Sequence, residues 1–254
     1  LEKQNLASFE SHIISGVFYL KNSNINLARE YFLKAKNKNS RLILNNYISS
    51  SLYSWSNLSN LNQATLDLKK LDNRFENLKK IQNVFLNCYF NDPSTNNLFS
   101  EITSDQKTDF SRYYYFYASN VASKGEINNA VAIIKTALEL YPRNLLLNQL
   151  SKDLNKNNKA QVFDCKKEEH VIAEILYITA NALSSQSAYS QSNFYLNLAR
   201  YLNNEFYSYD TLLAENFYKI NNFKRAKIIY NDLSKNGEAY NWYSSKQLAR
   251  ILIQ

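Results

Sequence analysis

Glycine and proline are scarce in this sequence, which has 3 Gly and 2 Pro among 254 residues. A β-sandwich or a Rossmann-type α/β domain of this length needs many tight turns, where these two residues are concentrated. Their scarcity therefore predicts helices joined by short loops. Hydrophobic residues at 45% and charged residues at 20% indicate a folded chain rather than a disordered one.

Long apolar runs, cysteine motifs and methionine are also missing. No apolar run reaches the roughly 18 residues of a membrane-spanning helix. Cys88 and Cys165 are isolated and belong to no Cys-x-x-Cys motif, so we expect neither a metal site nor a redox site, and they do not fix the compartment. Because Met is absent and an apolar helical pattern still runs at the last residues, we expect the natural chain to extend beyond both ends.

Residues suited to catalysis are few and scattered. The two histidines, His12 and His170, are separated by most of the chain, and His12 is expected in the core or at a helix end. Cys165 precedes His170 by five residues, a spacing that does not place both on one helix face. Gly-rich phosphate loops, GxSxG and HExxH motifs are absent. We therefore expect the protein not to be an enzyme, and to bind no cofactor, no metal ion and no small-molecule substrate.

The net charge of +8 and the pI near 9.2 permit an acidic partner. The basic residues are scattered, however, and several stand beside acids, as in "KKEEH" at 166–170. This pattern is typical of solvated helix faces.

An internal repeat is the most informative feature of the chain. In residues 9–42, small residues and aromatic rings recur at Gly16, Tyr19, Ala28, Phe32 and Ala35. Ala130 follows Ala28 by 102 residues, which is three periods of about 34. The same offsets recur in three further segments, at Ala118, Ala130, Ile134 and Ala137, at Ala180, Leu183, Ser192, Leu196 and Ala199, and at Ala214, Phe217, Ala226, Tyr230 and Leu233.

Small residues at this spacing let two neighbouring helices approach closely, and the pattern resembles that of bacterial tetratricopeptide-repeat proteins over nearly the whole chain. The last third is similar to a group of such proteins from alphaproteobacteria, through Ala173–Glu174, Tyr177, Ala180, Ala182–Leu183, Tyr195–Leu196 and residues 198–202. The resemblance implies an all-α fold, a right-handed α-solenoid of helix pairs, with protein-binding function and often an N-terminal export segment. It implies no catalytic residues.

The repeat frame predicts two stacks. The N-terminal stack, residues 1–144, contains units at about 9–42, 43–76, 77–110 and 111–144, of which the middle two are degenerate. Residues 145–172 break the register and predict an irregular helix and a polar connector that could act as a hinge. The C-terminal stack, residues 173–254, contains units 173–206 and 207–240 and a partial unit 241–254.

The run "RYYYFY" at 112–117 raises three alternatives: a stacking platform for nucleobases, a membrane-surface patch or the faces of an ordinary helix. The repeat frame favours the helix, with Tyr114, Tyr117, Ala118 and Val121 in the core. The same frame predicts a concave face that binds a peptide. Its predicted residues are Arg112, Tyr115, Ser119, Glu174, Tyr177, Asn181, Glu215, Tyr218 and Lys219.

The sequence therefore predicts a non-catalytic scaffold or adaptor that binds a peptide or helix of a partner protein. The alternative is a helical-repeat protein that binds RNA or another acidic polymer, although the inner positions of successive units carry no recurring code. A bacterial, periplasmic or membrane-associated location is favoured over the cytoplasm through the resemblance.

Overall fold

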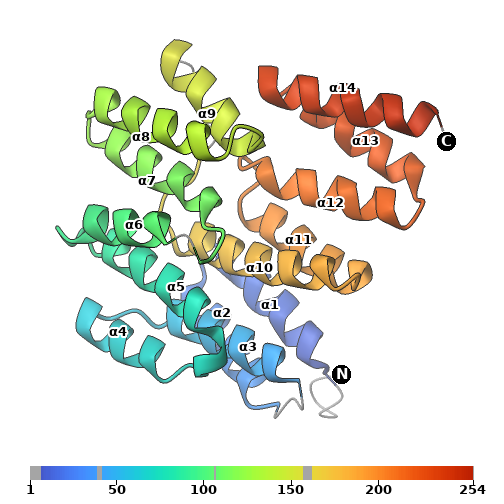
Figure 1. Cartoon of the computed structure of the whole chain (residues 1–254). Helices are drawn as coiled ribbons and strands as arrows, with labels where there is room; N and C mark the ends of the chain where they lie inside the picture. Colours follow the sequence, from blue (N-terminus) through green and yellow to red (C-terminus); the bar gives the residue numbers. More distant parts are fainter. Residues whose placement is uncertain (1–6, 39–41, 106, 157–161, 254) are drawn as a thin grey trace. The chain divides into compact units, whose positions relative to one another are not determined.

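The computed structural model describes residues 7–38, 42–105, 107–156 and 162–253 of the chain (Figure 1). Within these ranges it contains fourteen α-helices, a short 3-10 helix and no β-strand. The prediction of an all-α fold is confirmed.

Two compact units divide the helices between them. The first unit comprises residues 1–92, 164–186 and 194–204. Its helices are α1 (Phe9–Lys21), α2 (Ile25–Lys36), α3 (Ile43–Trp55), α4 (Leu61–Lys69), η2 (Asn73–Phe75), α5 (Glu76–Tyr89), α10 (Glu168–Ser185) and most of α11 (Tyr189–Leu202).

The second unit comprises residues 93–163, 187–193 and 205–254, and so includes the first residues of α11. Its other helices are α6 (Thr95–Ser104), α7 (Ser111–Ser123), α8 (Ile127–Leu140), α9 (Leu145–Lys156), α12 (Ser208–Lys219), α13 (Phe223–Leu233) and α14 (Glu238–Leu252).

Consecutive helices pack against each other within each unit, as α1 and α2, α7 and α8, and α12 and α13 do. The units do not coincide with the stacks expected at 1–144 and 173–254, because α10 packs on α3 and α14 packs on α9. The apolar pattern of a helix sets which face is buried, but it does not specify which distant helix covers that face.

The turns inside the helix pairs share one backbone conformation. A residue with positive φ follows the first helix of five pairs: Ser23, Asn91, Gly125, Ser187 and Asn221. Gly125 lies 34 residues after Asn91, which lies 68 after Ser23, and Asn221 lies 34 after Ser187. These left-handed residues end the first helix of each pair, so the 34-residue period of the sequence is also a period of the backbone.

Hydrogen bonds at these turns repeat as well. The backbone N–H of Asn24 donates to the Tyr19 carbonyl at 2.9 Å, and that of Asn222 donates to the Phe217 carbonyl at 2.8 Å. Equivalent bonds join Asp92 to Asn87 and Glu126 to Val121. A bond of this span caps the helix C-terminus and satisfies a carbonyl that the helix itself leaves without a donor.

The small residues of the repeat are buried, as predicted. Ala28, Ala130, Ala199 and Ala226 are each 0% exposed. At Gly16, a Cβ atom would lie 2.4 Å from the ring of Phe32, so only glycine fits between α1 and the ring that α2 places there. Leu183 is only half-buried, although the frame expects it in the core.

An asparagine joins successive helix pairs at equivalent places in the second unit. Asn120 on α7 donates to the Asn96 side chain on α6 at 2.8 Å, and Asn216 on α12 donates to the Ser192 hydroxyl at 2.8 Å. Asn216 also reaches Asn193 at 2.9 Å and is only 1% exposed. Because 24 residues separate both donor–acceptor pairs, the repeat includes a polar contact as well as an apolar one.

The segment 145–172, expected to hold an irregular helix and a polar connector, begins with a packed helix. Leu146, Leu147 and Leu150 of α9 are buried, and α9 contacts α7, α8 and α14. The helix expected at the start of this segment is therefore present and packs within the second unit through its apolar side chains, and the hinge stays a prediction. Residues 157–161 lie outside the described part of the chain.

The two cysteines are not isolated in space. A disulfide joins Cys88, near the end of α5, to Cys165, which precedes α10, with the Cα atoms 5.9 Å apart. Both belong to the first unit, and 77 residues separate them in the sequence. Sequence spacing could not reveal this pair, because the packing of the helices, and not a local motif, brings the sulfur atoms together.

Candidate functional site

The residues predicted for a concave face differ in exposure. Asn181, Glu215 and Lys219 are exposed, whereas Arg112, Ser119, Tyr177 and Tyr218 are half-buried and Tyr115 and Glu174 are buried. Glu174, Tyr177 and Asn181 belong to the first unit, and the others belong to the second. Within the first unit, Glu174, Tyr177 and Asn181 share α10, and within the second unit, Glu215, Tyr218 and Lys219 share α12.

Tyr115 does not line a surface, contrary to the prediction. Its side chain is 1% exposed, and its ring lies 5.3 Å from that of Phe206, in the segment before α12. Burial raises the pKa of Tyr115 above its ordinary range. The two-helix frame assigned Tyr115 to an open face, but that face of α7 is covered by a segment about 90 residues further along the chain.

The rest of the aromatic run packs inside the second unit. Tyr113 and Phe116 are buried, and Tyr114 and Tyr117, which were expected in the core, are half-buried. The Tyr117 ring stacks on Phe99 of α6 with 5.8 Å between the centroids. The run is therefore packing rather than an exposed stacking platform, but the rings that are most deeply buried differ from those predicted.

Glu174 also lies in the interior and not on a surface. It is 0% exposed on α10, where every residue from His170 to Leu176 is buried. A helix buried through two full turns has neighbours on more than one side. The alternation of inner and outer positions that the repeat frame expects does not hold for this part of α10.

Arg112 links α7 to the start of α12. Its guanidinium lies 5.2 Å from the ring centre of Phe206 and 5.9 Å from that of Tyr209, and it donates a hydrogen bond to the Ser208 hydroxyl. A cation above aromatic faces is attracted by their negative quadrupole. These contacts assign Arg112 a structural role within the second unit.

Two of the predicted residues, Glu215 and Tyr218, contact side chains of α14. The Tyr243 hydroxyl donates a hydrogen bond to the Glu215 carboxylate, and the Arg250 guanidinium lies 5.1 Å from the ring centre of Tyr218. Burial, and after it the Glu215 charge, raises the pKa of Tyr243 above its ordinary range. This surface of α12 is therefore continuous with the side chains of α14.

A pocket lies where α14 meets the start of α9, with a volume of 880 Å³. Its lining residues all belong to the second unit: Pro142, Arg143, Leu145, Asn148, Lys152, Glu238, Ala239, Trp242, Tyr243, Lys246 and Gln247. The largest side chain among them, Trp242, is 69% exposed, and the Lys246 ammonium lies 5.4 Å from the centre of one of its rings. An open indole beside cations and amides has the composition of a recognition surface.

The N-terminus of α14 is held by α9. The Gln149 side-chain oxygen accepts a hydrogen bond of 3.0 Å from the backbone N–H of Ala239, and the Gln149 amide donates to Asp153 at 2.8 Å. Gly237, the residue before α14, has φ 125° and ψ 165°, and a Cβ there would lie 2.3 Å from the Gln149 side chain. Gln149 thus replaces the side-chain cap that Gly237 lacks.

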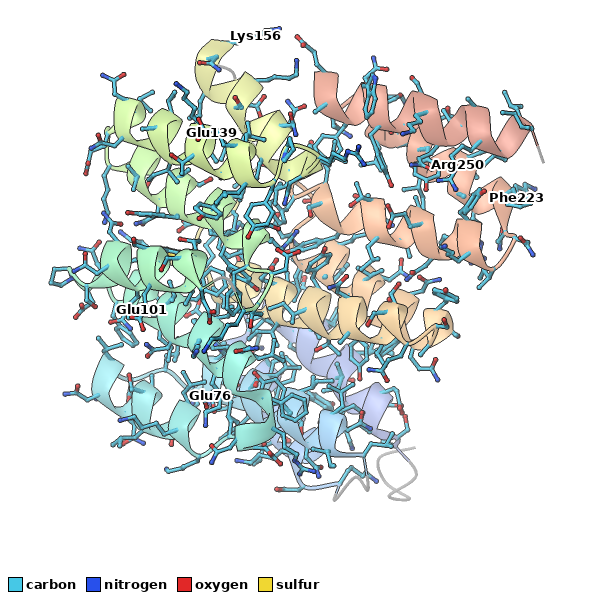
Figure 2. The ribbon with its side chains drawn as sticks, in the orientation of Figure 1. Glu76, Glu101, Glu139, Lys156, Phe223 and Arg250 are labelled. Atoms are coloured by element: carbon cyan, nitrogen blue, oxygen red, sulfur yellow. A yellow bond between two sulfur atoms is a disulfide. The ribbon has the colours of Figure 1, made fainter. Side chains whose placement is uncertain are left out.

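Ion pairs add to this junction. Glu238 pairs with Lys152 at 2.7 Å and with Lys156, which lies at the end of α9 (Figure 2). Hydrogen bonds from the two lysines lower the pKa of Glu238 to about 2. The carboxylate that lines the pocket is therefore already neutralised by cations of α9.

Sequence reasoning did not find this pocket. Trp242 and Lys246 fell in the partial unit 241–254, and Arg143 stands at the end of the unit 111–144, so no repeat position drew attention to them. One signal was present: a tryptophan next to a tyrosine in "NWYSSK", a stretch whose other residues are polar.

Residues suited to catalysis have other contacts here. Cys165 is bonded to Cys88, and the His170 ring nitrogen Nδ1 accepts a hydrogen bond of 2.9 Å from the Asp164 N–H. Burial lowers the pKa of His170, and His12 is buried on α1, as expected. Within the described residues, no group of three or more His, Cys, Asp and Glu side chains could hold a metal ion.

The described helices include none that is long and apolar enough to cross a membrane. No family model and no curated protein matches this chain.

Proposed function

We propose that this protein is a non-catalytic scaffold of the tetratricopeptide-repeat type, a right-handed solenoid of helix pairs that binds a segment of a partner protein. The observation that carries the proposal is the 880 Å³ pocket at α9 and α14, with Trp242 exposed in its wall. Exposed aromatic rings in concave sites supply rigid apolar area at low entropic cost, as in protein-binding surfaces.

The repeat supports the scaffold part of the proposal. Left-handed turn residues recur 34 residues apart, buried alanines lie between paired helices, and equivalent asparagines join successive pairs. Repeats of this kind build rigid supports whose stability comes from contacts between neighbours, which leaves their exposed positions free for binding.

The binding surface runs from the pocket across α12. Tyr243 lines the pocket and bonds to Glu215, so the exposed part of α12 with Tyr218 and Lys219 extends the same surface. Tyr177 and Asn181 on α10 remain candidate contacts in the first unit, while Tyr115 and Glu174, being buried, support the helices that carry them.

We propose an oxidising compartment for the protein, with the bacterial periplasm or a membrane-associated location favoured by the resemblance. The disulfide between Cys88 and Cys165 supports this location, because such bonds form and persist outside the reducing cytosol.

Site-specific photo-crosslinking tests the function. A photoreactive phenylalanine analogue replaces Trp242 in one variant and Tyr218 in another, and both are exposed to extracts of cells that naturally produce the protein. We expect a defined protein adduct from both positions. The control is the same analogue at Ile228, which is 55% exposed on α13 and outside the pocket. Adducts formed equally at position 228, or none at 218 and 242, would contradict the proposal.

A further inference from the structure

We infer that the pocket between α9 and α14 selects acidic peptide segments, in which carboxylates flank an apolar side chain seated on Trp242. This inference rests on the proposed function and specifies its ligand class. The inference is carried by the charge and the apolar composition of the pocket residues. None of the lining residues was among the predicted site residues, although Tyr243 contacts one of these, Glu215.

The lining has an excess of positive charge. Arg143, Lys152 and Lys246 are basic and Glu238 is the acidic residue among the eleven, which gives +3 − 1 = +2. Glu238 forms ion pairs with Lys152 and with Lys156, so its negative charge is compensated by these two lysines of α9. No described ion pair joins Arg143 or Lys246 to a carboxylate, and both side chains are exposed. Their charge is therefore available to a ligand.

The geometry matches a peptide with mixed chemistry. Lys246 lies above a Trp242 ring, so a carboxylate bound by the ammonium would sit beside the indole face. Asn148 and Gln247 line the same pocket. The Asn148 Nδ2 group already donates to the Pro142 and Asn144 carbonyls, and the Gln247 side-chain oxygen accepts from Arg250, so the Asn148 oxygen and the Gln247 N–H groups are the atoms that can pair with a peptide backbone. Apolar contact at the centre with complementary charge at the rim is the usual arrangement of a peptide-binding site.

An acidic polymer such as RNA would use the same cations, but the pocket favours the peptide. Binding dominated by phosphates needs a row of cations along a groove. In this pocket, Lys152 is paired with Glu238, the one carboxylate among the lining residues. Arg143 and Lys246 are the lining cations that Glu238 does not engage, and two cations are too few to follow a phosphate backbone, whereas they can pair with the spaced carboxylates of a peptide.

The test is selection from a phage-displayed library of random peptides against the whole chain with its disulfide formed. We expect bound peptides to be enriched in Asp and Glu next to a Leu, Ile or aromatic residue. A synthetic peptide of the enriched sequence should change the fluorescence of Trp242 against a constant contribution from Trp55, which is only 2% exposed. Replacing the acids of this peptide by Asn and Gln should weaken binding at least about tenfold, as should raising salt from about 0.05 to about 0.5 M.

Variants assign the binding to the pocket. The double substitution Arg143→Glu and Lys246→Glu should weaken the acidic peptide about tenfold or more, and Trp242→Ala about thirtyfold, measured by calorimetry. The matched controls are Lys224→Glu and Ile228→Ala on α13, both exposed and outside the pocket, which should change affinity less than about twofold. Circular dichroism verifies that each variant keeps its helix content.

The outcomes separate the two proposals. Enrichment of neutral or basic peptides that still depend on Trp242 would overturn the acidic ligand class and leave the scaffold function intact. Binding of an RNA oligonucleotide that protects Trp242, with no peptide enriched, would overturn both. Acidic peptides insensitive to Arg143→Glu, Lys246→Glu and Trp242→Ala would remove the ligand from the pocket and so overturn the inference alone.

Discussion

At the scale of single residues, Gly237 is the position where the α9–α14 junction permits least change. Its backbone occupies a region essentially restricted to glycine, and the Gln149 side chain lies against its Cα. A side chain at 237 would strain the backbone and displace Gln149, which then could not accept the Ala239 N–H.

We therefore predict that Gly237→Ala lowers the free energy of unfolding by about 3 kcal/mol, from backbone strain plus loss of a helix cap. Gly125→Ala is the matched control, because Gly125 also has positive φ, at 86°, but nothing lies within 4 Å of an added Cβ. Its loss should be about 1–2 kcal/mol. Urea denaturation measures both, and equal losses would contradict a specific role for Gln149.

Glu238 makes the junction sensitive to acid. Its pKa in the folded chain is about 2, below the ordinary 4.5, so its paired, charged form stabilises the fold above pH 4.5. This contribution is lost as the pH falls from 4.5 towards 2, because the unfolded chain then binds the proton first. Salt should also reduce it, since the pair is exposed.

The pH dependence of the Glu238 contribution is checked by comparing the melting temperatures of the unmodified chain and of Glu238→Gln. We expect a difference near neutral pH that shrinks as the pH approaches 2 and at high salt. Glu139→Gln on α8 serves as the control carboxylate for the ordinary effect of charge removal. A difference that is constant from neutral pH to pH 2 would show that the ion pairs with α9 are not its source.

At the scale of elements, the disulfide is the strongest constraint between segments distant in sequence. It connects the end of α5 to the segment before α10 and closes a loop of 77 residues. Because a cross-link restricts the unfolded chain, a loop of this length is expected to stabilise the fold by about 4–5 kcal/mol.

We predict that Cys88→Ser with Cys165→Ser lowers the free energy of unfolding by about this amount, and that a reductant lowers the stability of the unmodified chain to a similar level. Chemical denaturation with and without reductant measures the effect. The double variant is its own control, since reductant should leave its stability unchanged. A reductant effect on the double variant would mean that the loss arises elsewhere.

The contacts between successive helix pairs differ in strength at equivalent places. Asn216 is buried and donates to both Ser192 and Asn193, whereas Asn120 is half-buried and donates to Asn96. When one partner of a buried hydrogen bond is removed, the remaining polar group stays buried without a partner, and its full desolvation penalty destabilises the folded state.

Asn216→Ala is therefore expected to destabilise the chain by about 2 kcal/mol and Asn120→Ala by about 1 kcal/mol, measured by thermal or urea unfolding. Each variant controls for the other, because both remove the same group at the same place in the repeat. A larger loss at Asn120 would show that burial does not govern these contacts.

At the scale of the whole molecule, the net charge of +8 predicts only weak, non-specific attraction to nucleic acid. We expect binding to a mixed RNA pool to be detectable at low salt and to vanish at moderate salt, as measured by filter binding. Salt-resistant, sequence-selective RNA binding would instead support the acidic-polymer alternative. The acidic peptide selected on the chain provides the comparison in the same buffers.

The sequence by itself determined the helical class and the period. Scarce glycine and proline, and small residues at fixed offsets, are properties of contiguous segments, so they can be recognised without knowing which distant segments meet. Gly16 and Ala130 could be placed in the core because close approach of two consecutive helices requires small side chains there.

Tertiary structure alone decided which distant segments meet. Tyr115 and Glu174 are interior residues because segments distant in the sequence pack on their helices: Phe206 lies against Tyr115, and α3 packs on α10. Helix packing likewise joins Cys88 to Cys165 and lets α9 hold α14 and form the pocket. An apolar stripe specifies that a face is buried, while the identity of the covering helix depends on packing between residues far apart in the chain. For that reason the repeat could be predicted from the sequence and the pocket could not.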